Sequence, residues 1–368
     1  MKKKKILIVS SSLRVGGLER VAVNCAKYSD CGKYNFDFLV FGNEIGGLEQ
    51  EVQSYGWTII RIKKPENKLW KFYKEVCRVM KENGPYDAVH SHTFFNSGIV
   101  LLAAKHSGIP CRIAHSHSIK RKGQQNVARL VYNWIMRRLL NAYSTTVCAC
   151  SVQAGNYLFG EKRFQSEGII IPNVIDPTQY AFDADSREQA REEFNIAPDT
   201  LLIGQIGHLS SVKNPCFLLK VFSVLVKNVK SKLILVGDGP LFPVLRDEIA
   251  NLGLTEYVIM PGIRNDVSRL MSAMDVYVCT STNEGFGLVL LEALANGLPC
   301  VGEKNAIVKE IVEFGHCTLV DSFNSAEPWA QVIEDVALRG RIADGYNRIK
   351  NSIYTPASLK LTMSKIYQ

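Results

Sequence analysis

Two glutamates eight positions apart flank a glycine-rich turn in the string Glu284-Gly-Phe-Gly-Leu-Val-Leu-Leu-Glu292. A helix is expected to begin near Gly287, where free amide N–H groups and the positive end of the helix dipole favour a phosphate. The glycines let a ligand approach the backbone closely, and the Glu292 carboxylate can accept both hydroxyls of a ribose. The string predicts a phosphate and ribose site, whereas two isolated glutamates would indicate only a helix-capping acid and a solvated one.

A lysine occupies the corresponding place after another predicted strand, in Gly207-His-Leu-Ser-Ser-Val-Lys213 directly after Leu201–Ile206. Open α/β sheets bind ligands at the carboxyl ends of their strands. Lys213 would there neutralise the charge that develops on a leaving diphosphate. An ordinary surface lysine is the alternative interpretation.

A double glycine, Gly16-Gly17, follows the first predicted strand, Ile6–Ser10. Such a turn suits contact with a donor phosphate or an acceptor, and a purely structural turn is the alternative. The pattern is not Gly-x-Gly-x-x-Gly, and no P-loop lysine follows it. Neither a nicotinamide cofactor nor ATP is therefore favoured.

Four histidines lie at the ends of two short predicted strands: His90, His92, His115 and His117. A zinc site built from these histidines is one interpretation, and packed strand-end side chains are another. The ten cysteines are scattered, without the repeated pairs of a disulfide or zinc framework. We therefore expect reduced cysteines and no zinc framework built from them.

Predicted strands alternate with helices along the whole chain, which is typical of parallel sheets made of βαβ units. The 368 residues favour two domains. A proline-containing segment at 169–178 closes the first series of elements, and a second series begins at Leu201–Ile206. We predict two Rossmann-like domains, at 1–175 and 176–353, that face a central cleft. A C-terminal helix at 354–368 is expected to pack back toward the first domain.

The net charge of +9 is unevenly distributed, with +14 in residues 1–175 and −5 in the remainder. A basic half indicates contact with an anionic surface. No apolar run reaches the length of about 18 residues that a membrane span needs. The apolar run Ile6–Val9, after the initial lysines, is also too short for the core of a signal peptide.

A basic segment, Lys120-Arg-Lys122, precedes a predicted helix whose apolar residues stand at 127, 130, 131, 134, 135 and 139. A cationic amphipathic helix of this kind can lie on an anionic bilayer. Packing of the apolar stripe on its own domain is the alternative. Nucleic acid is not favoured, because no aromatic-basic repeat or reading helix is present.

Together these motifs resemble glycosyltransferase family 4, retaining and metal-independent enzymes with the GT-B fold. The resemblance is strongest over residues 200–300, where Glu-Gly-Phe-Gly-x4-Glu-Ala is followed by Asn296-Gly-Leu-Pro299. It extends to the following segments: Gly16-Gly17, Ile171-Pro-Asn173 with Asp176, Gly207 to Lys213, Leu235-Val-Gly-Asp-Gly-Pro240, and Pro261-Gly262. Few motifs match in the first domain, so the acceptor side is weakly determined.

The resemblance implies roles for individual residues. Glu284 would lie by the donor sugar, and one histidine, His115 in preference to His117, would contact the transferred sugar. His208 stands where the family usually has arginine, which leaves the second cationic phosphate contact open. The implied catalytic residues are His115, Glu284 and Lys213. The implied donor-binding residues are Gly16, Gly17, His208, Ile263, Phe286, Gly287, Leu288, Val289 and Glu292.

The resemblance also implies an activity of the hexosyltransferase class. The enzyme would transfer a sugar from a nucleotide-sugar, with a UDP-sugar favoured, to a saccharide or lipid-linked acceptor in bacterial surface polysaccharide synthesis. It would need no cofactor and no metal, and would work in the cytoplasm or peripherally on the inner face of the membrane. A nucleotide-sugar 2-epimerase and a non-catalytic sugar-nucleotide-binding partner of another transferase are the alternatives.

Overall fold

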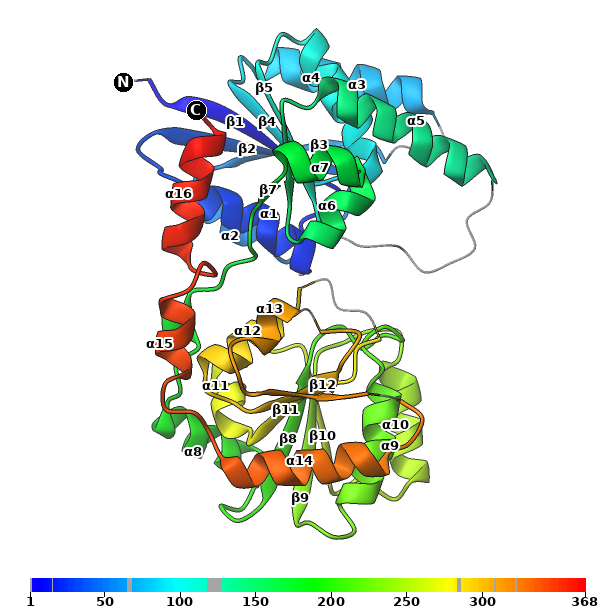
Figure 1. The fold of residues 1–368 in the computed structure, drawn as a ribbon, viewed down its shortest axis with the longest axis vertical. Coiled ribbons are helices and arrows are strands. Elements are labelled where there is room, and N and C mark those ends of the chain that lie inside the picture. Colours follow the sequence, from blue (N-terminus) through cyan, green and yellow to red (C-terminus); the bar gives the residue numbers. More distant parts are fainter. Residues whose placement is uncertain are drawn as a thin grey trace. The chain divides into compact units, whose positions relative to one another are not determined.

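The computed structural model describes residues 2–14, 16–64, 68–117, 127–282, 286–307, 309–321 and 323–368. The chain forms two compact units. The boundaries between them lie after residues 174 and 355, close to the predicted boundaries after residues 175 and 353. The first unit combines Met1–Val174 with the C-terminal segment Pro356–Gln368, and the second is Ile175–Thr355 (Figure 1).

The first unit is built on a seven-stranded parallel sheet with the order β3-β2-β1-β4-β5-β6-β7. Its strands are β1 (Lys4–Ser10), β2 (Tyr34–Phe41), β3 (Thr58–Ile62), β4 (Ala88–Ser91), β5 (Cys111–Ser116), β6 (Thr146–Ala149) and β7 (Ile169–Ile170). Its helices are α1 (Gly17–Lys27), α2 (Glu49–Ser54), α3 (Leu69–Glu82), α4 (Ser97–His106), α5 (Val127–Tyr143), α6 (Val152–Phe159), α7 (Glu161–Glu167) and α16 (Pro356–Ile366).

Alternating residues of the first sheet face two different sets of helices. Leu7 and Val9 of β1 belong to an apolar core shared with α3, α4 and α6. The opposite face of the sheet lies toward α1 and α16, which contact each other. Tyr367, directly after α16, packs edge-on against Tyr34 of β2. The histidines of β4 and β5 lie on this second face, since His90 Nδ1 is 2.9 Å from the Tyr367 hydroxyl.

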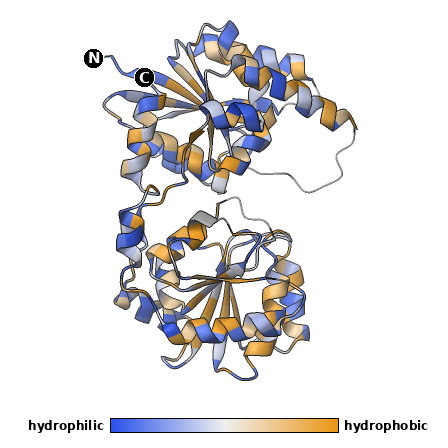
Figure 2. Ribbon diagram, viewed as in Figure 1, coloured by the Kyte–Doolittle hydropathy of each residue, from blue (hydrophilic) through white to orange (hydrophobic). Residues whose placement is uncertain are grey.

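The second unit is built on a six-stranded parallel sheet with the order β10-β9-β8-β11-β12-β13. Its strands are β8 (Leu201–Ile206), β9 (Ser231–Val236), β10 (Val258–Gly262), β11 (Val276–Cys279), β12 (Cys300–Glu303) and β13 (Cys317–Val320). Its helices are α8 (Ala184–Glu193), α9 (Pro215–Leu225), α10 (Phe242–Asn251), α11 (Val267–Ala273), α12 (Leu288–Ala295), α13 (Lys309–Val312), α14 (Glu327–Arg339) and α15 (Gly345–Lys350). Figure 2 shows hydrophobic residues along these strands, and separate apolar clusters cover the two faces of the sheet.

Both sheets reverse their strand order once, between β1 and β4 in the first unit and between β8 and β11 in the second. In open parallel sheets the carboxyl ends of the strands at this switch point form the ligand site. The predicted fold class, two Rossmann-like α/β domains with parallel sheets, is confirmed.

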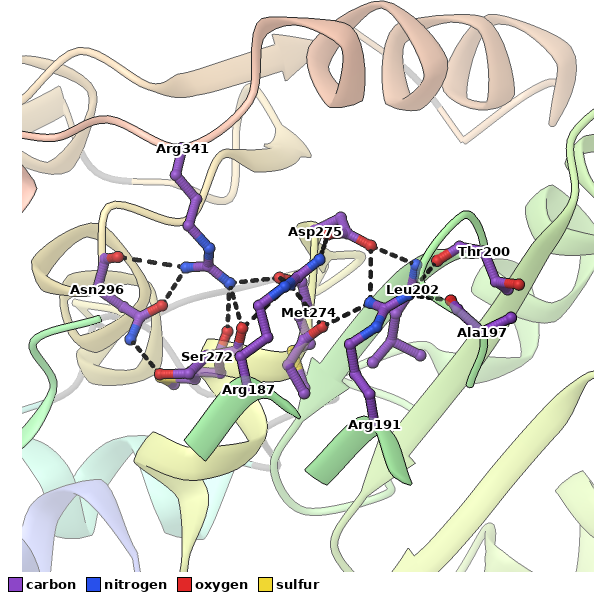
Figure 3. A network of polar contacts seen from close by, with 12 residues as sticks. Arg187, Arg191, Ala197, Thr200, Leu202, Ser272, Met274, Asp275, Asn296 and Arg341 are labelled. Atoms are coloured by element: carbon purple, nitrogen blue, oxygen red, sulfur yellow. Dashed lines mark hydrogen bonds and ion pairs between the residues drawn. The ribbon is translucent and has the colours of Figure 1, made fainter. Parts of the chain in front are cut away.

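Three arginines hold the second unit together, two of them through the Asp275 carboxylate (Figure 3). Asp275 accepts hydrogen bonds from Arg187 at 2.6 Å and from Arg191 at 3.2 Å, both on α8. Arg341 donates to the carbonyl oxygens of Met271, Ser272 and Met274 at the end of α11. These contacts satisfy carbonyls that the helix leaves without an internal partner, and they attach α8 and the segment after α14 to α11.

Candidate functional site

In the second unit, the carboxyl ends of four neighbouring strands converge on the residues that the sequence singled out. Gly207 follows β8, Gly237 follows β9, Gly262 ends β10 and Thr280 follows β11. Backbone hydrogen bonds continue past the strands, from Gly207 N to Val236 O and from Gly237 N to Gly262 O, each at 2.9 Å. The glycine turns therefore lie side by side at one edge of the sheet.

Glycine is required where these turns touch. Gly237 has φ of +131°, and a Cβ built on it would lie 2.0 Å from the Gly207 carbonyl oxygen. A Cβ on Gly239 would lie 2.4 Å from the Leu209 carbonyl oxygen. Because these atoms belong to backbone, they cannot move aside as a side chain would. The absence of side chains here exposes backbone groups to a ligand.

The loop that carries Lys213 is fastened to the loop that leads into α12. Thr280 Oγ1 lies 3.0 Å from the carbonyl oxygens of both Lys213 and Asn214, to which its hydroxyl donates. Gln205 Nε2 donates to Thr280 Oγ1 at 3.0 Å and to Lys213 O at 3.1 Å. The two predicted donor motifs are thus joined by side chains at the ends of adjacent strands, β8 and β11.

Lys213 is half-buried, and its Cε lies 3.5 Å from the place of a Cβ on Gly207. The aliphatic part of the side chain therefore runs along the glycine turn. His208 is exposed in the same loop. The loop consequently presents one cation and one imidazole at the edge where the predicted diphosphate would bind.

Helix α12 begins as predicted. Gly287 precedes it in the left-handed conformation (φ 82°, ψ 56°) and no side chain caps the first turn. Glu292, half-buried on α12, accepts a hydrogen bond of 3.0 Å from the Tyr180 hydroxyl. The backbone oxygen of Tyr180 in turn accepts from Asn296 Nδ2 at 2.9 Å. The Glu292 carboxylate is thereby oriented by a residue that carried no sequence signal.

The other predicted donor-side residues differ in their exposure to solvent. Glu284 falls outside the described residues. The Phe286 side chain is only 5% exposed and packs on Tyr354 in the core, so only its backbone is available to a ligand. Ile263, 73% exposed just after β10, offers an apolar surface at the same sheet edge. Leu288 and Val289 are half-buried in the first turn of α12.

In the first unit, Gly16 precedes α1 with extended backbone and Gly17 begins the helix. The Glu19 side chain folds back over this turn, with Oε2 2.6 Å from the place of a Cβ on Gly16. Its other carboxylate oxygen accepts from the Ser12 hydroxyl at 2.8 Å. A carboxylate therefore lies at this turn, and the contact of Gly16 and Gly17 with the donor stays a prediction.

The two histidines that the sequence left as alternatives occupy different environments. His115 lies inside β5 with no exposed surface, and its Nδ1 is 3.3 Å from His90 Nε2. His117 lies beyond the strand and is partly exposed. Burial lowers the pKa of His117 to about 3, which keeps the ring neutral. His117 is thus the more exposed of the two residues, although its Nδ1 is buried and its Nε2 lies 2.8 Å from His92 Nδ1. The choice between His115 and His117 as the contact of the transferred sugar stays a prediction.

Helix α5 turns most of its predicted apolar stripe outward. Five of the six apolar residues are between 42% and 75% exposed: Val127, Leu130, Val131, Trp134 and Ile135. Leu139 alone of the six packs against the core, next to the buried Met136 and Leu140. The interpretation that the stripe packs on its own domain is therefore wrong for most of its length. The basic segment at 120–122 lies outside the described residues, as do all of 118–126.

Two family models match adjacent parts of the chain. The model described as "Glycosyltransferase Family 4" matches residues 15–179, and "Glycosyl transferases group 1" matches residues 186–352. The putative glycosyltransferase EpsF of Bacillus subtilis is 33% identical over 341 residues, which cover 92% of this chain and 89% of EpsF. The chain belongs to glycosyltransferase family 4. This glycosyltransferase is thus an enzyme, as the resemblance implied.

Two further proteins are similar to this glycosyltransferase. The UDP-Gal:alpha-D-GlcNAc-diphosphoundecaprenol alpha-1,3-galactosyltransferase of Escherichia coli is 26% identical, over 72% of this chain and 73% of that protein. The structure of Anabaena HepE in complex with UDP-glucose superposes with a TM-score of 0.80 at 21% identity, covering 98% of each chain. The latter similarity shows the GT-B fold.

Within the second unit of the glycosyltransferase, the structure adds three residues to those found from the sequence. Gln205 lies inside a strand, Thr280 directly follows one, and Tyr180 follows a short 3₁₀ turn. Each acts through a hydrogen bond to a residue distant in sequence. Polar residues are common at strand ends and in loops. The residue types and spacing of Gln205, Thr280 and Tyr180 therefore did not mark them as site residues in the sequence.

Proposed function

We propose that this glycosyltransferase transfers a sugar from a UDP-sugar bound by the second unit to a lipid-linked saccharide, with retention of the anomeric configuration. One observation carries the proposal: Thr280, directly after β11, holds the Lys213 loop through hydrogen bonds. The chain after Thr280 leads into α12, which carries Glu292. A cation, a helix N-terminus and a carboxylate at one sheet edge match the diphosphate and ribose of a nucleotide-sugar.

Each donor-side group has a distinct task in the proposed mechanism. Lys213 and the amides at the start of α12 stabilise the charge on the departing diphosphate. Glu292 accepts the ribose hydroxyls while Tyr180 holds one of its oxygens. Glu284 remains the predicted contact of the donor sugar. One histidine of the predicted pair, His115 or His117, remains the proposed contact of the transferred sugar.

The transfer step needs no protein nucleophile. The bond between the anomeric carbon and the phosphate oxygen breaks, and a bond from the acceptor oxygen forms on the same face of the sugar. The acceptor proton passes to the departing phosphate, so the leaving group serves as the base. Because Lys213 and the helix amides supply positive charge, the step is proposed to proceed without a metal ion at the diphosphate.

The substrate classes in this proposal are supported by the similar proteins. HepE was crystallised with UDP-glucose, and the Escherichia coli enzyme is named for a UDP-sugar donor and a diphosphoundecaprenol-linked acceptor. An acceptor of that chemistry is held in a membrane. The proposed role is therefore sugar addition to a lipid-linked precursor of a surface polysaccharide, at the cytoplasmic face of the membrane.

The outward face of α5 provides the proposed membrane contact. No helix among the described residues has both the length and the apolar character needed to cross a bilayer. The exposed Trp134 has the Arg138 guanidinium 4.9 Å above its ring, which pairs an interfacial aromatic group with a cation. Apolar residues beside arginines suit the interface of an anionic bilayer, and the first unit is the basic half of the chain.

A donor and acceptor screen tests this function. Thermal shifts with UDP, GDP and ADP and their sugars should show stabilisation by the UDP compounds, about 2.7 kcal/mol at 100 times the dissociation constant. Transfer to a polyprenyl-diphosphate-linked saccharide should continue in EDTA and give a product with the donor's anomeric configuration, read by NMR. Conversion of the donor sugar without acceptor would indicate an epimerase, and binding without turnover a non-catalytic partner. If no nucleotide stabilises the protein, the donor site is wrongly assigned.

A further inference from the structure

A cysteine on α1 faces two of the histidines beneath it in the first unit. Cys25 Sγ, a ring nitrogen of His92 and a ring nitrogen of His115 all lie within 4.8 Å of one another. All three residues are fully buried. Among the described residues, this is the one group of three or more histidine, cysteine or acidic side chains with such convergence.

Strand register explains why the histidines meet. Ser91 of β4 pairs with Ala114 of β5, so His92 and His115 stand level on adjacent strands. Their ring centroids are 5.0 Å apart. Cys25 lies on the helix that covers this face of the sheet.

The hydrogen bonds of the two histidines leave the same ring nitrogen without a partner. His92 Nδ1 lies 2.8 Å from His117 Nε2, and His115 Nδ1 lies 3.3 Å from His90 Nε2. The Nε2 atoms of His92 and His115 are both buried and have no hydrogen-bond partner. Buried polar atoms without a partner cost about 1–3 kcal/mol each, so two such atoms beside a thiol call for an explanation.

One proton arrangement satisfies every hydrogen bond in this cluster and leaves both Nε2 lone pairs available. His92 donates from Nδ1 to His117, and His115 donates from Nδ1 to His90. His90 then donates from its own Nδ1 to the Tyr367 hydroxyl, 2.9 Å away. Histidines that bind metals through Nε2 are commonly held in this way by a hydrogen bond from Nδ1.

We propose that Cys25, His92 and His115 bind one zinc-type metal ion, through Cys25 Sγ and the Nε2 atoms of the two histidines. Zinc takes sulfur at about 2.3 Å and imidazole nitrogen at about 2.0–2.1 Å, so small side-chain rotations bring the ligand atoms into range. A water molecule completes the tetrahedron. Ser10 Oγ is also buried and without a partner, and Ser10 stands level with His92 because Val9 of β1 pairs with Ser91 of β4.

Metal binding converts a protonated thiol into a thiolate. A free thiol has a pKa of about 8.5, so the metal-free side chain carries a proton at neutral pH. On binding, the S–H proton is released to solvent and the metal–sulfur bond forms. Binding therefore releases one proton per ion.

The ion would act on structure and not on the transfer step. Its ligands have no exposed surface, so it cannot touch the donor diphosphate. It would fix α1 against β4 and β5, and α1 begins at the Gly16-Gly17 turn. Transfer that continues during brief exposure to EDTA is consistent with both proposals, because a buried ion exchanges slowly.

Metal analysis of the purified full chain tests the site. We expect close to one zinc per chain by plasma mass spectrometry after dialysis, and a loss to background in Cys25→Ser and His92→Asn. Cys148→Ser is the matched control, because Cys148 is also fully buried and pairs with His115 in the strand register. That variant should retain the ion.

Cobalt loading of the wild-type chain keeps the proposal testable if the variants fail to fold. Co²⁺ bound by a thiolate gives a strong charge-transfer absorption in the near ultraviolet, which this site should show. A wild-type chain that contains no metal and gains no such absorption on incubation with Co²⁺ overturns the proposal. Full metal content in a folded Cys25→Ser variant overturns it as well. Loss of nucleotide binding would instead count against the proposed function.

Discussion

The Tyr180 hydroxyl donates a 3.0 Å hydrogen bond to Glu292 Oε1, across 112 residues of sequence within the second unit. Glu292 is the carboxylate proposed to accept the donor ribose. Because the Tyr180 hydroxyl already holds the carboxylate in one orientation, the Glu292 side chain loses less conformational entropy when it binds the ribose hydroxyls. Tyr180 is therefore a positioning residue, which acts on the donor through Glu292.

Replacement Tyr180→Phe should weaken donor binding and leave the chemical step largely intact. A hydrogen bond to a charged group contributes about 1.5–3 kcal/mol, and part of this is recovered by water, so we expect KM for the donor to rise about 5- to 10-fold. Steady-state kinetics with varied donor measures the effect. Tyr257→Phe, at an exposed tyrosine, is the control. An unchanged KM in Tyr180→Phe would show that Glu292 does not need this contact.

Replacement Thr280→Val should loosen the Lys213 loop without changing the size of the side chain. It removes the hydroxyl that donates to the Lys213 and Asn214 carbonyls, at a cost of about 1–2 kcal/mol in stability. We expect a fall in kcat of about 10-fold, because a displaced cation stabilises the leaving group less well. Thr362→Val, which removes one side-chain bond to a carbonyl on α16, should leave kcat unchanged. Equal effects of the two variants on kcat would contradict the proposed loop attachment.

Replacement Arg341→Met should destabilise the second unit. The Arg341 guanidinium donates to three carbonyl oxygens at the end of α11 and contacts Asn296. Its removal deletes all of these contacts, although the carbonyls of Ser272 and Met274 keep a hydrogen bond from Arg187. We expect a loss of about 3 kcal/mol in the free energy of unfolding, measured by urea titration. Arg339→Met, at an exposed position on α14, should change stability by less than about 0.5 kcal/mol. A similar small change in Arg341→Met would contradict the structural role of the network.

The double replacement Leu130→Ser with Trp134→Ser should reduce membrane binding. Both side chains are more than half exposed on the outward face of α5, and each loses apolar area worth about 25 cal/mol per Å² at the bilayer interface. Co-sedimentation with vesicles that contain phosphatidylglycerol should fall at least about 10-fold. Trp70→Ser on α3, at a tryptophan of comparable exposure, is the control. Binding that is retained in the double variant would place the membrane contact elsewhere.

The sequence predicted the regular parts of the fold well, because hydrophobic periodicity marks buried strands and their flanking turns. Strand β8 has the residue bounds expected from the pattern, and strand β1 ends at Ser10 as expected. Helix α8, in contrast, consists mostly of polar and charged residues, which give no hydrophobic period. Its stability comes from Arg187 and Arg191, which bind Asp275 far along the chain, and such contacts have no local signature.

The sequence predicted which residues of the candidate site stand near strand ends, but it carried less information on the direction of their side chains. Lys213 lies in the loop after strand β8. Glu292 lies on α12, the helix that follows strand β11. The sequence could not show that His115 is fully buried and His117 partly exposed, because residues two positions apart share one face of a strand. The apolar stripe of α5 was visible in the sequence, but which side faces the core depends on packing with α4 that periodicity cannot supply.

The reaction rate of Lys213→Ala is the most direct test of the donor site. In the proposed mechanism this lysine neutralises the departing diphosphate, and removing such a contact should lower kcat by about 10²- to 10³-fold. Lys220→Ala, at an exposed lysine on α9, should keep wild-type turnover. A folded Lys213→Ala enzyme that turns over UDP-sugar at the wild-type rate would contradict the assignment of the diphosphate to this sheet edge.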